Sequence, residues 1–92
     1  MTLGMKNSQF EHIRHQKFIA LVQKLPTHIQ RRAAKQFQIL QENPLYPSLH
    51  FKKVSGLWSL RITDDYRALG YEENGTIIWF WIGKHDEYER RI

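Results

Sequence analysis

Two arginines and a histidine–tyrosine pair make the last third of this 92-residue chain suited to phosphate chemistry. Arg61 and Arg67 flank a short polar turn, and His85 and Tyr88 follow an apolar stretch. Arginine presents rigid N–H donors that match phosphate oxygens, and a histidine side chain ordinarily exchanges a proton near neutral pH. Tyrosine can stack on an unpaired base. These residue types suit metal-independent RNA cleavage, in which the 2′-hydroxyl loses a proton, the phosphorane gains charge and the 5′-oxygen is protonated.

Each of these residues also has a purely structural interpretation. A strand arginine often pairs with a nearby carboxylate, and Asp64, Asp65 or Glu72 lies close enough in sequence to serve in that way. A histidine or a tyrosine near the end of a chain often caps or packs instead of reacting. The two interpretations make opposite predictions, because catalysis requires the guanidinium groups and the imidazole to surround one hollow of phosphate size.

Four further residues are predicted to contact RNA. Lys52 and Lys53 are adjacent in a predicted strand, so one of them faces the open side of the sheet whichever register holds. Trp81 is a candidate for base stacking, with core packing as its alternative role, and Lys84 follows it as a candidate phosphate contact. A basic stripe on the second predicted helix, formed by Arg31, Arg32 and Lys35, suits RNA backbone, an acidic protein partner or solvent.

Composition narrows the class of protein. The chain has no cysteine, and His12 and His15 have metal-ligand spacing without a third ligand, so neither a metal nor a cofactor is predicted. Ten Lys/Arg against two acids give residues 1–63 a charge of +8, and four against seven give residues 64–92 a charge of −3, which sum to +5. This basic surface favours nucleic acid or an acidic protein as the partner. With no signal peptide and no apolar run of about 20 residues, we expect a cytoplasmic protein without a membrane partner.

The period of the apolar pattern changes near residue 50. Apolar residues recur with helical spacing over residues 18–25 and again over 29–40, where Thr27 is a plausible N-cap, with Pro26 between the two segments and Asn43-Pro44 after them. Two helices joined by so short a connection lie antiparallel as a hairpin. Beyond residue 50 the period is two, and strands are predicted at residues 50–54, 57–63, 66–72 and 76–83.

The connections between these strands are short, and Asn74-Gly75 is a strong hairpin signal, so neighbouring strands are predicted to be antiparallel. Residues 10–15 could add a short edge strand. Alternation in the last strand places Ile78, Phe80 and Ile82 on one face and Ile77, Trp79 and Trp81 on the other. The predicted fold class is α+β, a two-helix hairpin packed on an antiparallel sheet of about four strands. We expect a single domain over residues 1–92, with residues 1–9 flexible.

The order of these features resembles the RelE/ParE superfamily, the toxins of bacterial type II toxin–antitoxin systems. The resemblance runs from about Phe18 to the last residue. It rests on the helical hairpin and on these motifs: Phe51-Lys52-Lys53, Trp58-Ser59-Leu60-Arg61-Ile62, Tyr66-Arg67-Ala68-Leu69-Gly70 and Trp79-Phe80-Trp81-Ile82-Gly83-Lys84-His85-Asp86-Glu87-Tyr88.

Similarity to the RelE branch implies a toxin that enters the ribosomal A site and cuts mRNA without a metal. Arg61, Arg67, His85 and Tyr88 then fall at or near catalytic positions of that branch, although Tyr88 is one residue closer to Gly83 than its counterpart. Similarity to the ParE branch instead implies a DNA gyrase poison that acts by binding. A third alternative is an inactive member that binds antitoxin. All three imply a cognate antitoxin and a toxin–antitoxin hetero-oligomer, and the joint presence of His85 and Tyr88 favours mRNA on the ribosome.

Overall fold

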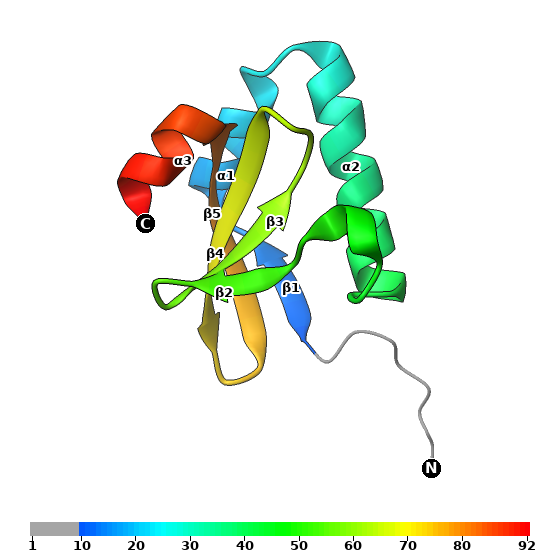
Figure 1. Ribbon diagram of the computed structural model, residues 1–92, viewed down its shortest axis with the longest axis vertical. Coiled ribbons are helices and arrows are strands. Elements are labelled where there is room, and N and C mark those ends of the chain that lie inside the picture. Colours follow the sequence, from blue (N-terminus) through cyan, green and yellow to red (C-terminus); the bar gives the residue numbers. More distant parts are fainter. Residues whose placement is uncertain (1–9) are drawn as a thin grey trace.

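The computed structural model describes residues 10–92, and the flexibility expected of residues 1–9 concerns a segment outside that range. A five-stranded sheet in the order β1-β5-β4-β3-β2 separates the long helix α2 on one side from the short helix α3 on the other (Figure 1). The elements are β1 (Glu11–Arg14), α1 (Gln16–Gln23), α2 (Thr27–Glu42), the 3-10 turn η1 (Pro47–Leu49), β2 (Lys52–Val54), β3 (Leu57–Arg61), β4 (Tyr66–Glu73), β5 (Thr76–Lys84) and α3 (His85–Arg91). The predicted α+β class is confirmed.

The sheet differs from the prediction in having a fifth strand. β2, β3, β4 and β5 form an antiparallel meander, whereas β1 pairs with β5 in parallel. The parallel edge is anchored by a side-chain contact, in which Trp79 Nε1 donates a hydrogen bond to His12 Nδ1 at 3.1 Å. The edge strand anticipated over residues 10–15 is therefore part of the sheet.

The main core lies between the sheet and the helical hairpin. α2 turns Ile29, Ala33, Gln36 and Leu40 toward the sheet, at the spacing that one helix face requires. Trp79 of β5 is fully buried, and Phe37 of α2 packs against it edge to face. The remaining buried members of this core are Phe18, Leu49, Leu60, Ile62, Ala68, Ile77 and Ile82.

A smaller core lies on the opposite face, under α3. Tyr88 of α3 packs against Leu69 of β4 and Trp81 of β5, and all three are buried. α3 begins immediately after β5, because the backbone N–H of His85 donates to the carbonyl of Asp65 at 2.7 Å. The residues after β5, for which the sequence predicted no helix, thus form a helix held against the sheet.

A β-bulge in β5 corrects the predicted alternation. Leu69 pairs with Trp81 but Gly70 pairs with Trp79, so Phe80 is an extra residue with no direct partner on β4. The bulge shifts the side chains beyond it by one position. Ile82 therefore shares the helix-hairpin face with Trp79, while Phe80 and Trp81 belong to the α3 face.

None of the helices within residues 10–92 combines the length and the apolar character that crossing a bilayer would require.

Candidate functional site: a basic hollow beside the third helix

A hollow of about 270 Å³ opens on the α3 face of the sheet, between β2, β3, β4 and α3. We call it the basic hollow. Its lining consists of His50, Lys52, Val54, Ser59, Arg67, His85, Tyr88, Glu89 and Ile92. Lys52 and Ser59 are register partners, so both side chains lie on the same face of the sheet, and the C-terminal helix closes the opposite wall.

Arg67 supplies the permanent positive charge in the inner part of the hollow. Its Nη1 donates to the carbonyls of Thr63, Asp64 and Tyr66, which holds the guanidinium against the β3–β4 turn. Burial, followed by the nearby Arg61 charge, lowers the pKa of Arg67 from its ordinary value, which is high enough for the group to remain cationic. Within residues 10–92, Nε and Nη2 make no hydrogen bond, so two donors remain for a ligand oxygen.

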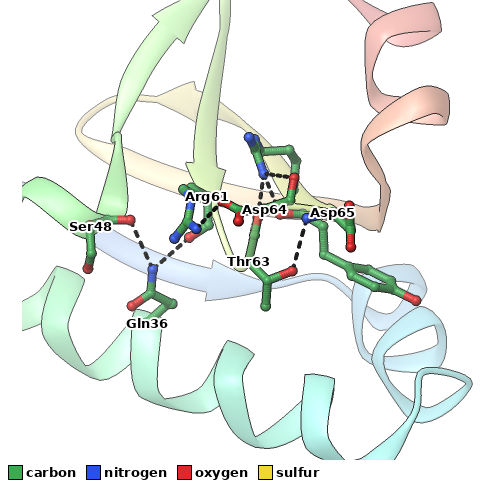
Figure 2. A network of polar contacts seen from close by, with 8 residues as sticks. Gln36, Ser48, Arg61, Thr63, Asp64 and Asp65 are labelled. Atoms are coloured by element: carbon green, nitrogen blue, oxygen red, sulfur yellow. Dashed lines mark hydrogen bonds and ion pairs between the residues drawn. The ribbon is translucent and has the colours of Figure 1, made fainter.

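Arg61 lies opposite Arg67 in the register but does not line the basic hollow. Its Nη2 forms an ion pair with Asp64 Oδ1 at 2.5 Å, and its backbone carbonyl accepts a hydrogen bond from Gln36 (Figure 2). The hydrogen bond from Arg61 is the main cause that lowers the pKa of the Asp64 carboxyl, and the positive charge of Arg61 lowers it further. Arg61 therefore lies outside the basic hollow and is paired with a local carboxylate, and its catalytic role stays a prediction.

His85 and Tyr88 come together because α3 places them three residues apart on one helix face. Their ring centroids are 5.5 Å apart, and both side chains line the basic hollow. His85 Nε2 lies 3.9 Å from Glu89 Oε2, one helical turn further on. The Tyr88 hydroxyl accepts a hydrogen bond from the Ser59 hydroxyl at 2.9 Å, so it is anchored to β3.

The structure separates the two adjacent lysines. Lys52 pairs with Ser59 and lines the basic hollow, whereas Lys53 pairs with Trp58 on the other face. The Lys53 ammonium lies 5.7 Å from the centroid of the Trp58 ring, a cation–π contact. Of the two predicted RNA contacts, only Lys52 is part of the site.

Two other predicted RNA contacts lie outside the hollow. Trp81 is 5% exposed and the guanidinium of Arg91 lies 4.7 Å from its ring centroid, so the ring packs in the smaller core instead of offering a face to a base. Lys84 is exposed but pairs with Tyr66, which packs against the main core. The bulge at Phe80 explains why Trp81 and Lys84 lie on other faces than strict alternation predicts, since it shifts the last residues of β5 by one position.

Sequence reasoning missed His50, Ser59 and Glu89. His50 follows η1 in a left-handed conformation with φ of 41°, and this turn directs the chain into β2 at the mouth of the hollow. Ser59 shares the α3 face with Leu69, its register partner on β4, and only the tertiary structure shows that it holds Tyr88. No sequence signal marked His50, because it lines the hollow together with His85, which is 35 residues away in the chain.

The titratable groups of the hollow do not form a metal site of the usual kind. Among residues 10–92, no three His, Asp or Glu side chains converge to the spacing of metal ligands. The hollow instead combines two imidazoles, one ammonium and one guanidinium with a single side-chain carboxylate, from Glu89. This set can bind an anion and transfer protons to or from it.

The fold is shared with known toxins. A chain of the RelB–RelE antitoxin–toxin complex from Methanococcus jannaschii superposes with a TM-score of 0.67 at 19% identity, covering 87% of this chain and 98% of that one. YafQ from E. coli gives 0.64 at 14% identity, with 87% and 98% covered. The YoeB/ParE toxin from Agrobacterium tumefaciens gives 0.62 at 12% identity, with 83% and 99% covered. At these identities the likeness shows the fold.

The family follows from the sequence itself. Residues 27–90 match the model of the ParE-like toxin domain, so the chain belongs to that family and is a toxin of the RelE/ParE superfamily. The family predicted from the motifs is thereby confirmed. No curated protein matches the sequence significantly.

Proposed function

We propose that this protein is the toxin of a toxin–antitoxin pair and that it inhibits translation by cutting mRNA on the ribosome. The observation that carries this proposal is the basic hollow, in which His50 and Lys52 around the start of β2, Arg67 of β4 and His85 of α3 converge from three separate parts of the chain. A gyrase poison that acts by binding has no use for two imidazoles beside a guanidinium. Solved structures of similar fold are antitoxin–toxin complexes, which supports a cognate antitoxin as the partner.

The proposed reaction is a transesterification. The RNA 2′-oxygen attacks the adjacent phosphorus and its proton passes to one imidazole, while the bond from phosphorus to the 5′-oxygen breaks and that oxygen receives a proton from the second imidazole. The products are a 2′,3′-cyclic phosphate and a free 5′-hydroxyl, so the reaction consumes no water and requires no metal ion. His85 and His50 are assigned this pair of proton transfers.

Arg67 and Lys52 are assigned to the phosphate. The phosphorane carries more negative charge than the ground state, and the donors at Nε and Nη2 of Arg67 can meet it without reorganising, because Nη1 is already held by the turn. Tyr88 is assigned a positioning role, since Ser59 holds its hydroxyl. Arg61 is assigned a structural role, because its ion pair with Asp64 supports the turn between β3 and β4.

The test combines induced expression with two readouts, mRNA cleavage on ribosomes and gyrase-linked DNA breaks. His85→Ala and Arg67→Ala should each lower mRNA cleavage by at least about 100-fold while antitoxin binding persists. His28→Ala, which changes an exposed histidine on α2, is the matched control and should cleave like the wild type. Wild-type cleavage by both His85→Ala and Arg67→Ala would refute the basic hollow as the catalytic site.

The ParE branch supplies a second candidate function, because the matching family model is ParE-like. Growth arrest with intact transcripts and broken DNA would establish the gyrase interpretation. Unaffected growth would indicate an inactive member that binds antitoxin. The ion pair of Arg61 with Asp64 and the hydrogen bond that anchors the Tyr88 hydroxyl would then be features of an inactive protein.

A further inference from the structure

A second hollow, of about 360 Å³, lies where the β3–β4 turn meets the end of β5 and the start of α3. We call it the turn hollow. Its lining consists of Asp65, Tyr66, Lys84, His85 and Asp86. The backbone N–H of His85 donates to the carbonyl of Asp65 at 2.7 Å, which joins the two sides of the turn hollow. Its volume is near the lower end of the range for small-ligand sites, roughly 300–1,000 Å³.

The turn hollow adjoins the basic hollow, because His85 lines both of them. The other four residues of the turn hollow belong to it and not to the basic hollow. Figure 2 shows Asp65 on the side of the β3–β4 turn away from Arg61. A strand of RNA whose phosphate occupies the basic hollow therefore has a neighbouring group at the turn hollow.

The polar side chains of the turn hollow have hydrogen-bonding capacity to spare. Within residues 10–92, the carboxylates of Asp65 and Asp86, the ammonium of Lys84 and the hydroxyl of Tyr66 make no hydrogen bond and no ion pair. Two carboxylates and one ammonium give this lining a formal net charge of −1 with His85 neutral. The turn hollow is thus opposite in charge to the basic hollow, and it favours a neutral group rich in N–H donors over a phosphate.

A nucleobase fits this description better than a metal ion does. Asp65, His85 and Asp86 line the same hollow, but in the described part of the chain no three His, Asp or Glu side chains converge as metal ligands. Bases of single-stranded RNA are neutral, carry N–H donors on their Watson–Crick edge and are commonly recognised after leaving the stack. RNA in the basic hollow supplies such a base at the required place.

We propose that the turn hollow binds a guanine next to the scissile phosphate and gives the protein a preference for that base. Guanine carries ring N1–H and amino N2–H donors side by side, which Asp65 and Asp86 accept, and O6 and N7 acceptors on another edge, which Lys84 meets. Adenine and cytosine each offer an amino group without a ring N–H, and uracil offers one N–H, so none of them matches both sets. The partly exposed Tyr66 ring, which packs on the main core, forms a wall for the base.

A binding measurement on the full chain tests the turn hollow without requiring cleavage. GMP should shift the NMR signals of residues 65–66 and 84–86, and it should bind about tenfold or more tightly than AMP, CMP or UMP. Inosine monophosphate lacks the amino group but keeps the ring N–H and O6, so its affinity should fall between those of GMP and AMP. Equal affinity for all four nucleotides, or shifts confined to the basic hollow, would overturn the inference.

Variants of the two carboxylates identify the residues that select guanine. Asp65→Asn and Asp86→Asn should each weaken GMP binding by about tenfold, because an amide replaces one acceptor oxygen with a donor. Glu87→Gln changes an exposed carboxylate of the same helix that does not line the turn hollow, so it should bind GMP like the wild type. Wild-type affinity in both Asp variants would contradict the assignment.

Mapping the cut sites on ribosome-bound mRNA tests the same preference during the reaction, and this part rests on the proposed function. The wild type should show guanine enriched at one position beside the broken bond. Asp65→Asn and Asp86→Asn should lower the ratio of cuts beside guanine to cuts beside other bases by about tenfold, and Glu87→Gln should keep the wild-type ratio. An unchanged ratio in both Asp variants would refute the role in cleavage. A protein that prefers GMP but cuts no RNA would refute the proposed activity and leave the turn hollow as a guanine site.

Discussion

The hydrogen bond between Ser59 and Tyr88 gives a prediction that separates structure from catalysis. The two hydroxyls are 2.9 Å apart, and their residues are 2% and 6% exposed, so water competes little for either group. Tyr88→Phe keeps the aromatic ring but leaves the Ser59 hydroxyl without this partner. A buried polar group that loses its partner costs about 1–3 kcal/mol, so we expect Tyr88→Phe to lower the free energy of unfolding by about 1–2 kcal/mol.

A double-mutant cycle measures the interaction itself. Ser59→Ala should cost a similar amount, because the Tyr88 hydroxyl then loses its donor. The double variant removes both polar groups, so its loss should fall short of the sum by about 1 kcal/mol. Urea unfolding followed by tryptophan fluorescence gives these values, and a loss of 1 kcal/mol corresponds to about 4–8 °C in Tm for a domain of this size. Additive losses, or no change in Tyr88→Phe, would refute the assigned geometry.

The same variants test the role of Tyr88 in cleavage. If the hydroxyl only positions the wall of the basic hollow, Tyr88→Phe and Ser59→Ala should lower ribosome-dependent cleavage by similar factors, each under about tenfold. If the hydroxyl acts on RNA, Tyr88→Phe alone should lose activity by about 100-fold or more, while Ser59→Ala stays near the wild type. The second result would contradict the positioning role.

Two further predictions concern polar groups in the main core. The buried Gln36 amide donates hydrogen bonds to the carbonyls of Ser48 at 3.2 Å and Arg61 at 2.8 Å (Figure 2). Gln36→Leu should therefore lower the free energy of unfolding, measured with urea, by about 2–4 kcal/mol. The control variant Gln38→Leu, which changes an exposed residue of the same helix, should unfold like the wild type. Burial lowers the pKa of His12 below 6.5, so the folded state disfavours its protonation, and stability should be fully present above pH 6.5 and decline as the pH falls below that value. His12→Asn, whose amide oxygen can accept from Trp79, should reduce this decline between pH 7.5 and pH 5, and an unchanged decline would assign it to other groups.

Local patterns along the chain were sufficient to predict the fold class. The two helices follow from apolar residues at helical spacing around Pro26, and the hairpins follow from short polar connections such as Asn74-Gly75. Such signals act within about ten residues, so the sequence expresses them directly. The family prediction succeeded for the same reason, because its motifs are contiguous.

The face that each side chain of β5 occupies depended on tertiary structure. Strict alternation predicted Phe80 and Ile82 on one face, but the bulge at Phe80 places Ile82 in the main core and Trp81 under α3. A bulge depends on how β4 and β5 pair as a whole, and a single apolar strand gives no local sign of it.

By itself, the sequence determined that this is a basic α+β toxin with arginine, lysine, histidine and tyrosine available for phosphate chemistry. Only the tertiary structure decided which of them meet. Arg67, His85, Tyr88 and Lys52 line one hollow, whereas Arg61 forms an ion pair with Asp64 outside that hollow and Lys53 lies on the other face. The physical reason is that residue type and strand period are local properties. A shared hollow instead requires β2, β4 and α3 to converge from distant parts of the chain, which depends on packing.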